Sequence, residues 1–158
     1  EAFMNCTGLN GHLTLGKGIT DIGSDCFDWC GFIGNLVIPD SVTELGYRAF
    51  YNCSGFSDTI TIGSNVQMIG DSAFFGCNSV STIISKSQRY TTYEGILYNA
   101  DMTELIYCPG AKTGTLSIPE TVKQISDYAI KGCDKMCGDR IIKNGVQAIK
   151  TSPSPAQS

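Results

Sequence analysis

The sequence has few of the features that mark a membrane protein, a nucleic-acid-binding protein or an enzyme. No run of 18 apolar residues occurs in the 158-residue chain, so we predict no membrane-spanning helix. The eleven lysines and arginines form no cluster, and the net charge at pH 7 is −4. Because nucleic-acid binding requires a concentrated basic stripe, we predict no nucleic-acid partner.

Histidine is almost absent, since His12 is the only one in the chain. A zinc site built on Cys26 and Cys30, or on Cys133 and Cys137, would therefore have no partner histidine. A Cys–His nucleophilic site would have to use His12, which falls on a position expected to face solvent. We therefore expect no metal site, no cofactor and no catalytic residue.

The chain does contain an internal repeat. Its phenylalanines Phe3, Phe27, Phe50 and Phe74 are 24, 23 and 24 residues apart, and the cysteines Cys6, Cys30, Cys53 and Cys77 keep the same steps. A fixed period of this size is typical of a solenoid, in which each unit buries its apolar face by stacking on its neighbours. Such proteins present broad surfaces rather than deep pockets, so the repeat favours binding over catalysis.

Each unit contains short alternating stretches, such as Leu13-Thr14-Leu15 and Ile60-Thr61-Ile62. Alternation with period two predicts a short strand with one buried face, and Pro39 or Gly63 then ends the strand. We therefore predict a strand-rich solenoid of short stacked strands with little regular helix. The phenylalanine column should form the spine of its core.

The fourth unit departs from the period. It begins with Val80 and Ile84 in the buried strand positions, but the next counterpart of Ile84 is Leu116, 32 residues later. The extra length holds two β-prone runs, Tyr93 to Tyr98 and Glu104 to Tyr107, joined by a loop rich in turn-forming residues. This pattern predicts a β-hairpin insert at about residues 90–110.

Two runs carry a specific resemblance, from Leu36 to Cys53 and from Leu116 to Cys133. They are similar to the BspA-like leucine-rich repeat, also called the Treponema pallidum type, and the insert from Tyr93 to Pro109 resembles a recurrent variant of that family. The resemblance implies a right-handed curved solenoid, a cell-surface or secreted location, and a role in adhesion and protein binding. It brings no shared catalytic residues. Departures include Cys26 for alanine, Ile130 for phenylalanine and Ser126 for glycine.

Eight cysteines invite a disulfide framework. Those in the repeated position, however, recur once per unit, and a buried free cysteine behaves as a small hydrophobic residue. We predict a stacked column of free thiols. Disulfides between neighbouring units stay open as an alternative on distance, although parallel side chains would not point toward each other.

The binding candidates are outward-facing strand positions and the aromatic residues of the insert. The strand positions form two columns, one of His12, Asn35, Thr59 and Thr115 and the other of Thr14, Val37, Thr61 and Ser117. The insert candidates are Tyr93, Tyr98 and Tyr107. Threonine also simply suits a strand, and some of the tyrosines must pack the insert onto the solenoid.

The sequence predicts one domain, a leucine-rich-repeat solenoid over residues 1–150, followed by a disordered Ser/Pro-rich tail or linker over residues 151–158. No signal peptide is visible, but Glu1-Ala2-Phe3 enters the repeat in mid-unit, so we expect a fragment or a processed form. We predict a non-catalytic module that binds a protein or possibly a glycan, as a monomer or a weak end-to-end oligomer. The alternative is a structural spacer in a larger surface protein.

Overall fold

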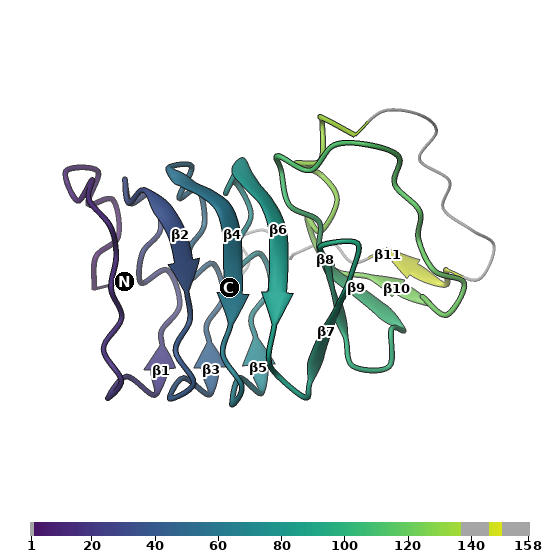
Figure 1. Ribbon diagram of the computed structural model, residues 1–158, viewed down its shortest axis with the longest axis horizontal. Helices are drawn as coiled ribbons and strands as arrows, with labels where there is room; N and C mark the ends of the chain where they lie inside the picture. Colours follow the sequence, from purple (N-terminus) through teal and green to yellow (C-terminus); the bar gives the residue numbers. More distant parts are fainter. Residues whose placement is uncertain (1, 137–145, 150–158) are drawn as a thin grey trace, which may run out of the picture.

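The computed structural model describes residues 2–136 and 146–149. Over this part of the chain the structure contains eleven strands and no helix. The strands lie side by side along the long axis of the molecule (Figure 1), so the prediction of a strand-rich solenoid is confirmed. None of the described residues forms a helix long and apolar enough to cross a membrane.

Three sheets build the solenoid. The first consists of β2 (Gly34–Val37), β4 (Phe56–Ile62) and β6 (Ser79–Ser85), and the second of β1 (Asp21–Ile22), β3 (Glu44–Leu45) and β5 (Met68–Ile69). Both are parallel. The third runs in the order β11 (Ala148–Ile149), β10 (Gln124–Ile125), β9 (Glu104–Tyr107), β8 (Ile96–Asn99) and β7 (Tyr90–Tyr93).

Successive units form coils that stack along the axis. We number them coil 1 (residues 9–30), coil 2 (32–53), coil 3 (56–77), coil 4 (79–109) and coil 5 (114–133). The rings of Phe3, Phe27, Phe50 and Phe74 stack through the first coils, with centroids 5.4, 5.2 and 6.1 Å apart. Phe50 is fully buried. The predicted phenylalanine spine is therefore confirmed.

The repeated cysteines have a polar role as well as an apolar one. The Cys53 thiol donates to the carbonyl oxygen of Phe27 at 2.9 Å, in the preceding coil. Cys30, Cys77 and Cys133 donate in the same way to Phe3, Phe50 and Cys108, at 3.0, 3.4 and 3.1 Å. In coils 1, 2, 3 and 5 a weak S–H donor of small volume thus bonds to a backbone carbonyl of the preceding repeat position. Cys6, Cys26, Cys30, Cys53 and Cys77 are free thiols, as predicted.

The insert forms the predicted hairpin and adds one strand to it. β8 and β9 pair antiparallel, and β7 pairs antiparallel with β8 on the other side. β9 then pairs in parallel with β10, with Leu105 opposite Ile125. The last strand of the insert therefore takes the place of the short strand that β1, β3 and β5 supply in the regular coils.

Two stretches expected as strands are not strands. In the first stretch of coil 1, His12 forms an isolated bridge to Ile33, and Leu13-Thr14-Leu15 has no ladder. Gly11, Gly16 and Gly18 flank this stretch, and glycine weakens a strand. In coil 5 the bridge lies at Gly114, opposite Met136, before Thr115. The predicted tail, residues 151–158, lies outside the described residues.

Candidate binding surface

The sheet β2–β4–β6 contains the two longest strands of the described residues, β4 and β6, with seven residues each. Val37, Thr61 and Ile84 lie opposite one another across the three strands. The neighbouring inward residues Leu36, Ile60 and Ile83 are 0, 0 and 1% exposed, whereas Val37 is 54% and Ile84 47% exposed. Alternation along the strands therefore separates a packed face from a face that presents two large apolar side chains to solvent.

A second row on this face contains Asn35, Thr59 and Thr82. Thr59 lies opposite Thr82, and the Asn35 side-chain oxygen accepts a hydrogen bond from the Thr59 amide at 3.3 Å. The register of β2 against β4 shifts between Gly34 and Leu36, and the Asn35 side chain bonds to the backbone at this irregularity. Asn35 thus has a structural role beside any role in binding.

The sequence prediction placed Ile84 at the wrong register. It set Ile84 at a buried strand position, but Ile83 pairs with buried Ile60, and Ile84 pairs with Thr61 on the outward face. The cause is a register shift between Asp58 and Thr59, because one extra residue moves every later side chain to the opposite face. Thr82 and Ile84 are therefore surface residues that sequence reasoning missed.

His12 does not continue the column of Asn35. It bridges to Ile33 instead, and its ring lies over Gly34, where an added Cβ would be only 2.5 Å from Nδ1. Gly34 has φ +81°, a conformation that favours glycine, and this leaves room for the imidazole. His12 and Thr14 are both exposed, but in coil 1 they lie outside any ladder.

Thr115 and Ser117 are exposed but do not extend the face of β6. The insert follows β6 in the stack, since the Ile83 amide donates to Gly95 O at 2.9 Å and the Ala111 amide to Val80 O at 2.8 Å. The eight predicted residues therefore do not form one continuous ladder. The insert separates those of coil 5 from those of coils 2 and 3.

The three tyrosines of the insert divide into one surface residue and two core residues. Tyr93 is 46% exposed, whereas Tyr98 and Tyr107 are 0 and 7% exposed and cannot contact a partner on the surface. Tyr107 packs against Phe74 with ring centroids 5.9 Å apart, and burial raises the pKa of Tyr98. Large aromatic side chains that face a hydrophobic cluster are buried with it. Of these three candidates, only Tyr93 stays available for recognition.

A cleft of about 550 Å³ joins two of the predicted residues. Tyr93 lines one side with Met102, and Ser117 and Pro119 line the other. Ser117 of coil 5 and Tyr93 of the insert therefore line the same cleft, although the sequence pattern predicted them as parts of two separate surfaces.

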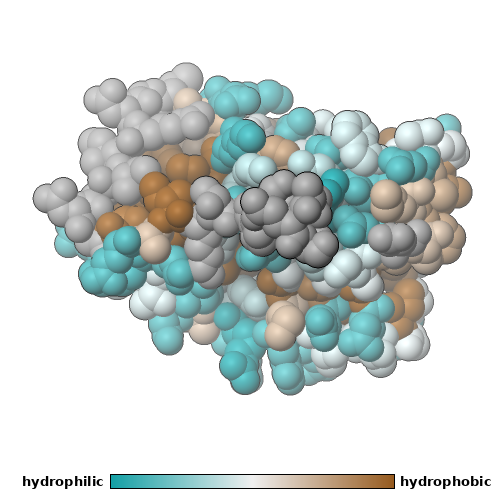
Figure 2. Space-filling view, turned by 180° about the vertical axis from the view of Figure 1, so that it is seen from behind, coloured by the Kyte–Doolittle hydropathy of each residue, from teal (hydrophilic) through white to brown (hydrophobic). Residues whose placement is uncertain are grey.

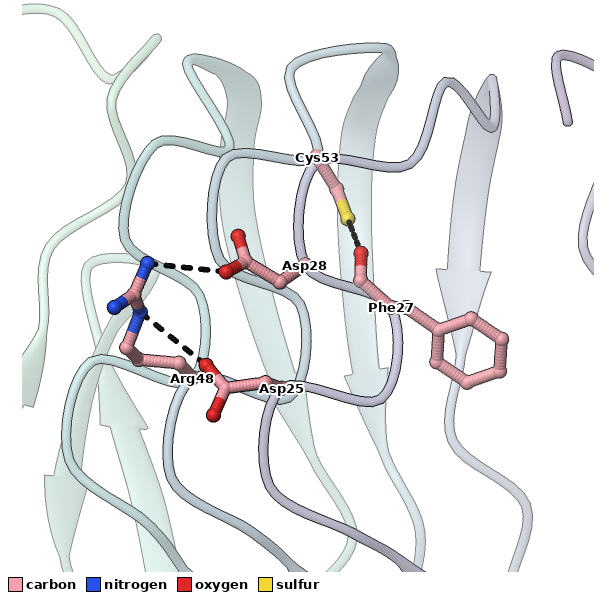
Figure 3. Close-up of polar contacts among 5 residues, drawn as sticks. All are labelled: Asp25, Phe27, Asp28, Arg48 and Cys53. Carbon is pink, nitrogen blue, oxygen red and sulfur yellow. Dashed lines mark hydrogen bonds and ion pairs between the residues drawn. The ribbon is translucent and has the colours of Figure 1, made fainter. Parts of the chain in front are cut away.

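A charged cluster on the return side of the coils joins coil 1 to coil 2 (Figure 3). Arg48 Nη2 lies 3.0 Å from Asp28 Oδ2 and Arg48 Nε lies 3.5 Å from Asp25 Oδ1, while the guanidinium lies 3.9 Å above the ring of Tyr51. Asp28 is 2% exposed, so burial raises its pKa although Arg48 acts in the opposite direction. These ion pairs join coil 1 to coil 2, while Asp28 Oδ1 and Arg48 Nε have no hydrogen-bond partner among the described residues.

The end of the molecule that carries coil 1 is apolar. Seen from behind, hydrophobic side chains gather there (Figure 2), and Phe3, Met4 and Leu9 are 46, 40 and 39% exposed. Phe3 already stacks on Phe27 with one ring face. End-to-end association through these residues stays a prediction.

No group of three or more histidine, cysteine, aspartate or glutamate side chains is placed to hold a metal ion within residues 2–136 and 146–149.

Comparison with solved structures finds proteins of the same architecture. A leucine-rich cell surface protein from Faecalibacterium prausnitzii superposes with a TM-score of 0.72 and 27% identity over 94% of this chain. A leucine-rich repeat protein from Eubacterium ventriosum gives 0.69 and 27% over 80% of the chain. The pneumococcal vaccine antigen PcpA gives 0.55 and 20% over 70%, which shows the fold alone.

This chain spans 39, 34 and 34% of those three chains, in the same order. Among curated protein sequences, none matches it significantly. The model of the BspA type leucine rich repeat region matches residues 1–137 and 106–152 in six copies. The family resemblance drawn from residues 36–53 and 116–133 is thus confirmed, and the chain belongs to the BspA-type leucine-rich repeat family.

Proposed function

We propose that this chain is a non-catalytic recognition module of a cell-surface or secreted protein, and that it binds a protein partner through the outward face of β2–β4–β6. The observation that carries the proposal is the row Val37–Thr61–Ile84, in which two large apolar side chains are about half exposed on a flat strand surface. Large apolar side chains gathered on a surface are typical of interaction sites.

The inward strand residues stabilise the stack of coils, and the outward strand residues stay available for binding. Residues such as Leu36 and Ile60 are fully buried because the coils stack through them, so they are not available to a partner. The outward positions contribute little packing, and substitutions there are expected to shift stability by about 0.5 kcal/mol or less. The description of the Faecalibacterium relative as a cell surface protein supports the proposed location.

The test is a binding experiment on the whole chain with matched variants. An array of purified extracellular-matrix and plasma proteins serves as the probe, with a glycan array beside it. The double variant Val37→Lys/Ile84→Lys places two charges on the strand face. Met68→Lys is the control, because Met68 is 55% exposed on the neighbouring sheet, in β5.

The proposal predicts that the double variant no longer binds a protein that the wild type binds, whereas Met68→Lys still binds it. The unfolding midpoints of both variants should be unchanged. A partner that binds the double variant as tightly as the wild type contradicts the strand face as the site. No bound protein on the array, with an intact fold, favours the spacer function instead.

A further inference from the structure

The return turn of coil 4 is two residues shorter than that of the other coils. From the short strand to the spine position there are five steps in coil 2 (Leu45 to Phe50, 50 − 45 = 5) and three in coil 4 (Leu105 to Cys108, 108 − 105 = 3). Backbone hydrogen bonds fix this equivalence. At the short strand, Ser126 N donates to Leu105 O at 2.9 Å, which matches the bond from Gly46 N to Ile22 O at 2.7 Å. At the spine position, Cys108 N donates to Ala129 O at 2.8 Å, which matches the bond from Phe27 N to Ala49 O at 2.9 Å.

In the regular coils the residue after the short strand is glycine, and in coils 2 and 3 the turn of the preceding coil leaves no room for a side chain there. A Cβ at Gly46 would lie 2.4 Å from Ser24 N, and one at Gly70 would lie 2.4 Å from Tyr47 N, both in the turn of the preceding coil. Coil 5 has Ser126 at this position, 5% exposed, and its hydroxyl donates to Glu104 Oε1 at 2.7 Å. A side chain fits here because the preceding turn is shortened.

The shortened turn leaves a hollow of about 300 Å³ between coils 3 and 5. Asp71 and Phe75 line it from coil 3, Asp127 and Tyr128 from coil 5, and Arg89 and Glu104 from the insert. Tyr90 also lines it, and its hydroxyl accepts a hydrogen bond from the Ile69 amide at 2.8 Å, at the edge where β5 has no further strand beside it. Its volume is at the lower end of the range for small-molecule sites, about 300–1,000 Å³.

The lining combines hydrogen-bond acceptors, a donor and aromatic rings. Three carboxylates and one guanidinium surround the space, so an anionic ligand such as phosphate is disfavoured. The carboxylates are not placed together to hold a metal ion, since no group of three or more ligating side chains is found among the described residues. Tyr128 is 37% exposed; its ring lies 5.0 Å from that of Phe75 and has Lys131 Nζ 4.6 Å from its centroid, so two aromatic side chains contribute to the lining.

We propose that this hollow binds one neutral sugar ring. The hydroxyls of a pyranose both donate and accept, which matches the carboxylates and the guanidinium, and its C–H faces pack on aromatic rings. The ring can come from a free monosaccharide or from the terminal unit of a glycan chain. This site goes beyond the proposed strand face and uses none of its residues.

The experiment is saturation-transfer NMR followed by calorimetric titration of the whole chain with a panel of neutral methyl glycosides, and with methylammonium as a cationic probe. The same sugars carried as terminal units on an albumin conjugate separate the two sources. Two variants remove lining groups, Asp71→Asn and Tyr128→Ala. Asp58→Asn, an exposed carboxylate in β4, is the matched control. Thermal unfolding of every variant checks the fold.

The proposal predicts saturation transfer from at least one glycoside, and an affinity about tenfold weaker in Asp71→Asn and in Tyr128→Ala, equivalent to about 1.4 kcal/mol. Asp58→Asn and Val37→Lys/Ile84→Lys should bind the sugar like the wild type, so the two proposals can fail separately. The absence of binding to every glycoside overturns the proposal. Sugar binding that survives both variants, or binding of methylammonium in place of the sugars, also overturns it.

Discussion

Coils 1–3 and coils 4–5 are built from the same repeat, yet different side chains fill their hydrophobic cores. In the first region one cluster is organised around the stacked rings of Phe27, Phe50 and Phe74. In the second region a separate cluster forms around Tyr98, Leu105 and Ile125, and the spine position holds Cys108 and Ile130 instead of phenylalanine. Tyr107 connects the two regions through its contact with Phe74.

This difference shows what an insertion does to a solenoid. On the coil 5 side β9 supplies a replacement for the missing short strand and pairs with β10, whereas on the coil 3 side β5 ends its sheet. The path of the chain between those ladders is free to change, and there the hollow and the cleft of the insert appear. Regular coils therefore give stability and a flat face, and the interruption gives concave surfaces.

The largest effect should come from the spine of the regular region. Phe50→Ala removes a fully buried ring that contacts rings on both neighbouring coils, and should lower the free energy of unfolding by about 3–5 kcal/mol. Urea denaturation followed by circular dichroism measures it. Val37→Ala in the same coil, on an exposed position, is the control and should change it little. Equal midpoints for the two variants would falsify the spine.

A smaller loss of stability is expected when the glycine after the short strand is replaced in coil 2, and almost none when it is replaced in coil 1. Gly46→Ala forces a Cβ to within 2.4 Å of backbone in coil 1 and should destabilise by about 1–3 kcal/mol. Gly23→Ala meets nothing within 4 Å and should be close to neutral. Differential scanning calorimetry of the pair gives the comparison. A Gly46→Ala variant as stable as Gly23→Ala would mean that the coils do not stack this closely.

The second region contains a buried hydroxyl that should be dispensable. Tyr98 is fully buried, and its hydroxyl has no hydrogen-bond partner among the described residues. Tyr98→Phe removes the desolvation penalty of that group and keeps the ring, so the variant should be more stable by about 1 kcal/mol. Chemical denaturation measures the change, with Tyr107→Phe as a comparison. A loss of stability in Tyr98→Phe would show that the hydroxyl is bonded.

The smallest effect is a dependence on pH. Burial raises the pKa of Asp28, so the folded state holds the proton more tightly, and this contribution to stability should grow as pH falls from neutral toward about 4. Asp40 behaves in the opposite way, because a hydrogen bond from the Ser64 amide lowers its pKa and its contribution is lost at low pH. Unfolding curves of Asp28→Asn and Asp40→Asn between about pH 2 and pH 7 separate the two, because the Asp40 contribution is lost mainly below about pH 4. Identical pH profiles of stability for the two variants would contradict the opposite contributions of Asp28 and Asp40.

The repeat made most of the first region predictable. A fixed period fixes which residues stack, so the phenylalanine spine, the cysteine column and the inward strand residues follow from the sequence. The register of β6 did not follow, because a single extra residue in the ladder exchanges the inward and outward sets and carries no sequence signature. This is why Ile84 was assigned to the wrong face.

The surfaces of the second region were harder to predict. The β-prone runs indicated a hairpin, but not that Tyr98 and Tyr107 face inward, since this depends on the packing of the insert against coils 3 and 5. One signal of the hollow was present in the sequence. Ser126 stands where the regular coils have glycine, and only the shortened turn of the preceding coil makes that residue possible.

The coupling between Ser126 and the shortened turn is the most direct test of this account. Ile106 can be replaced by the Gly-Asp-Ser turn of coil 3, which restores the two missing residues, with and without Ser126→Gly. A thermodynamic cycle from the unfolding of the four proteins gives the coupling energy. We predict that the restored turn is destabilising with Ser126, and that Ser126→Gly recovers about 1–3 kcal/mol. A restored turn that is tolerated equally with Ser126 and with glycine, and thus no coupling, would contradict the account.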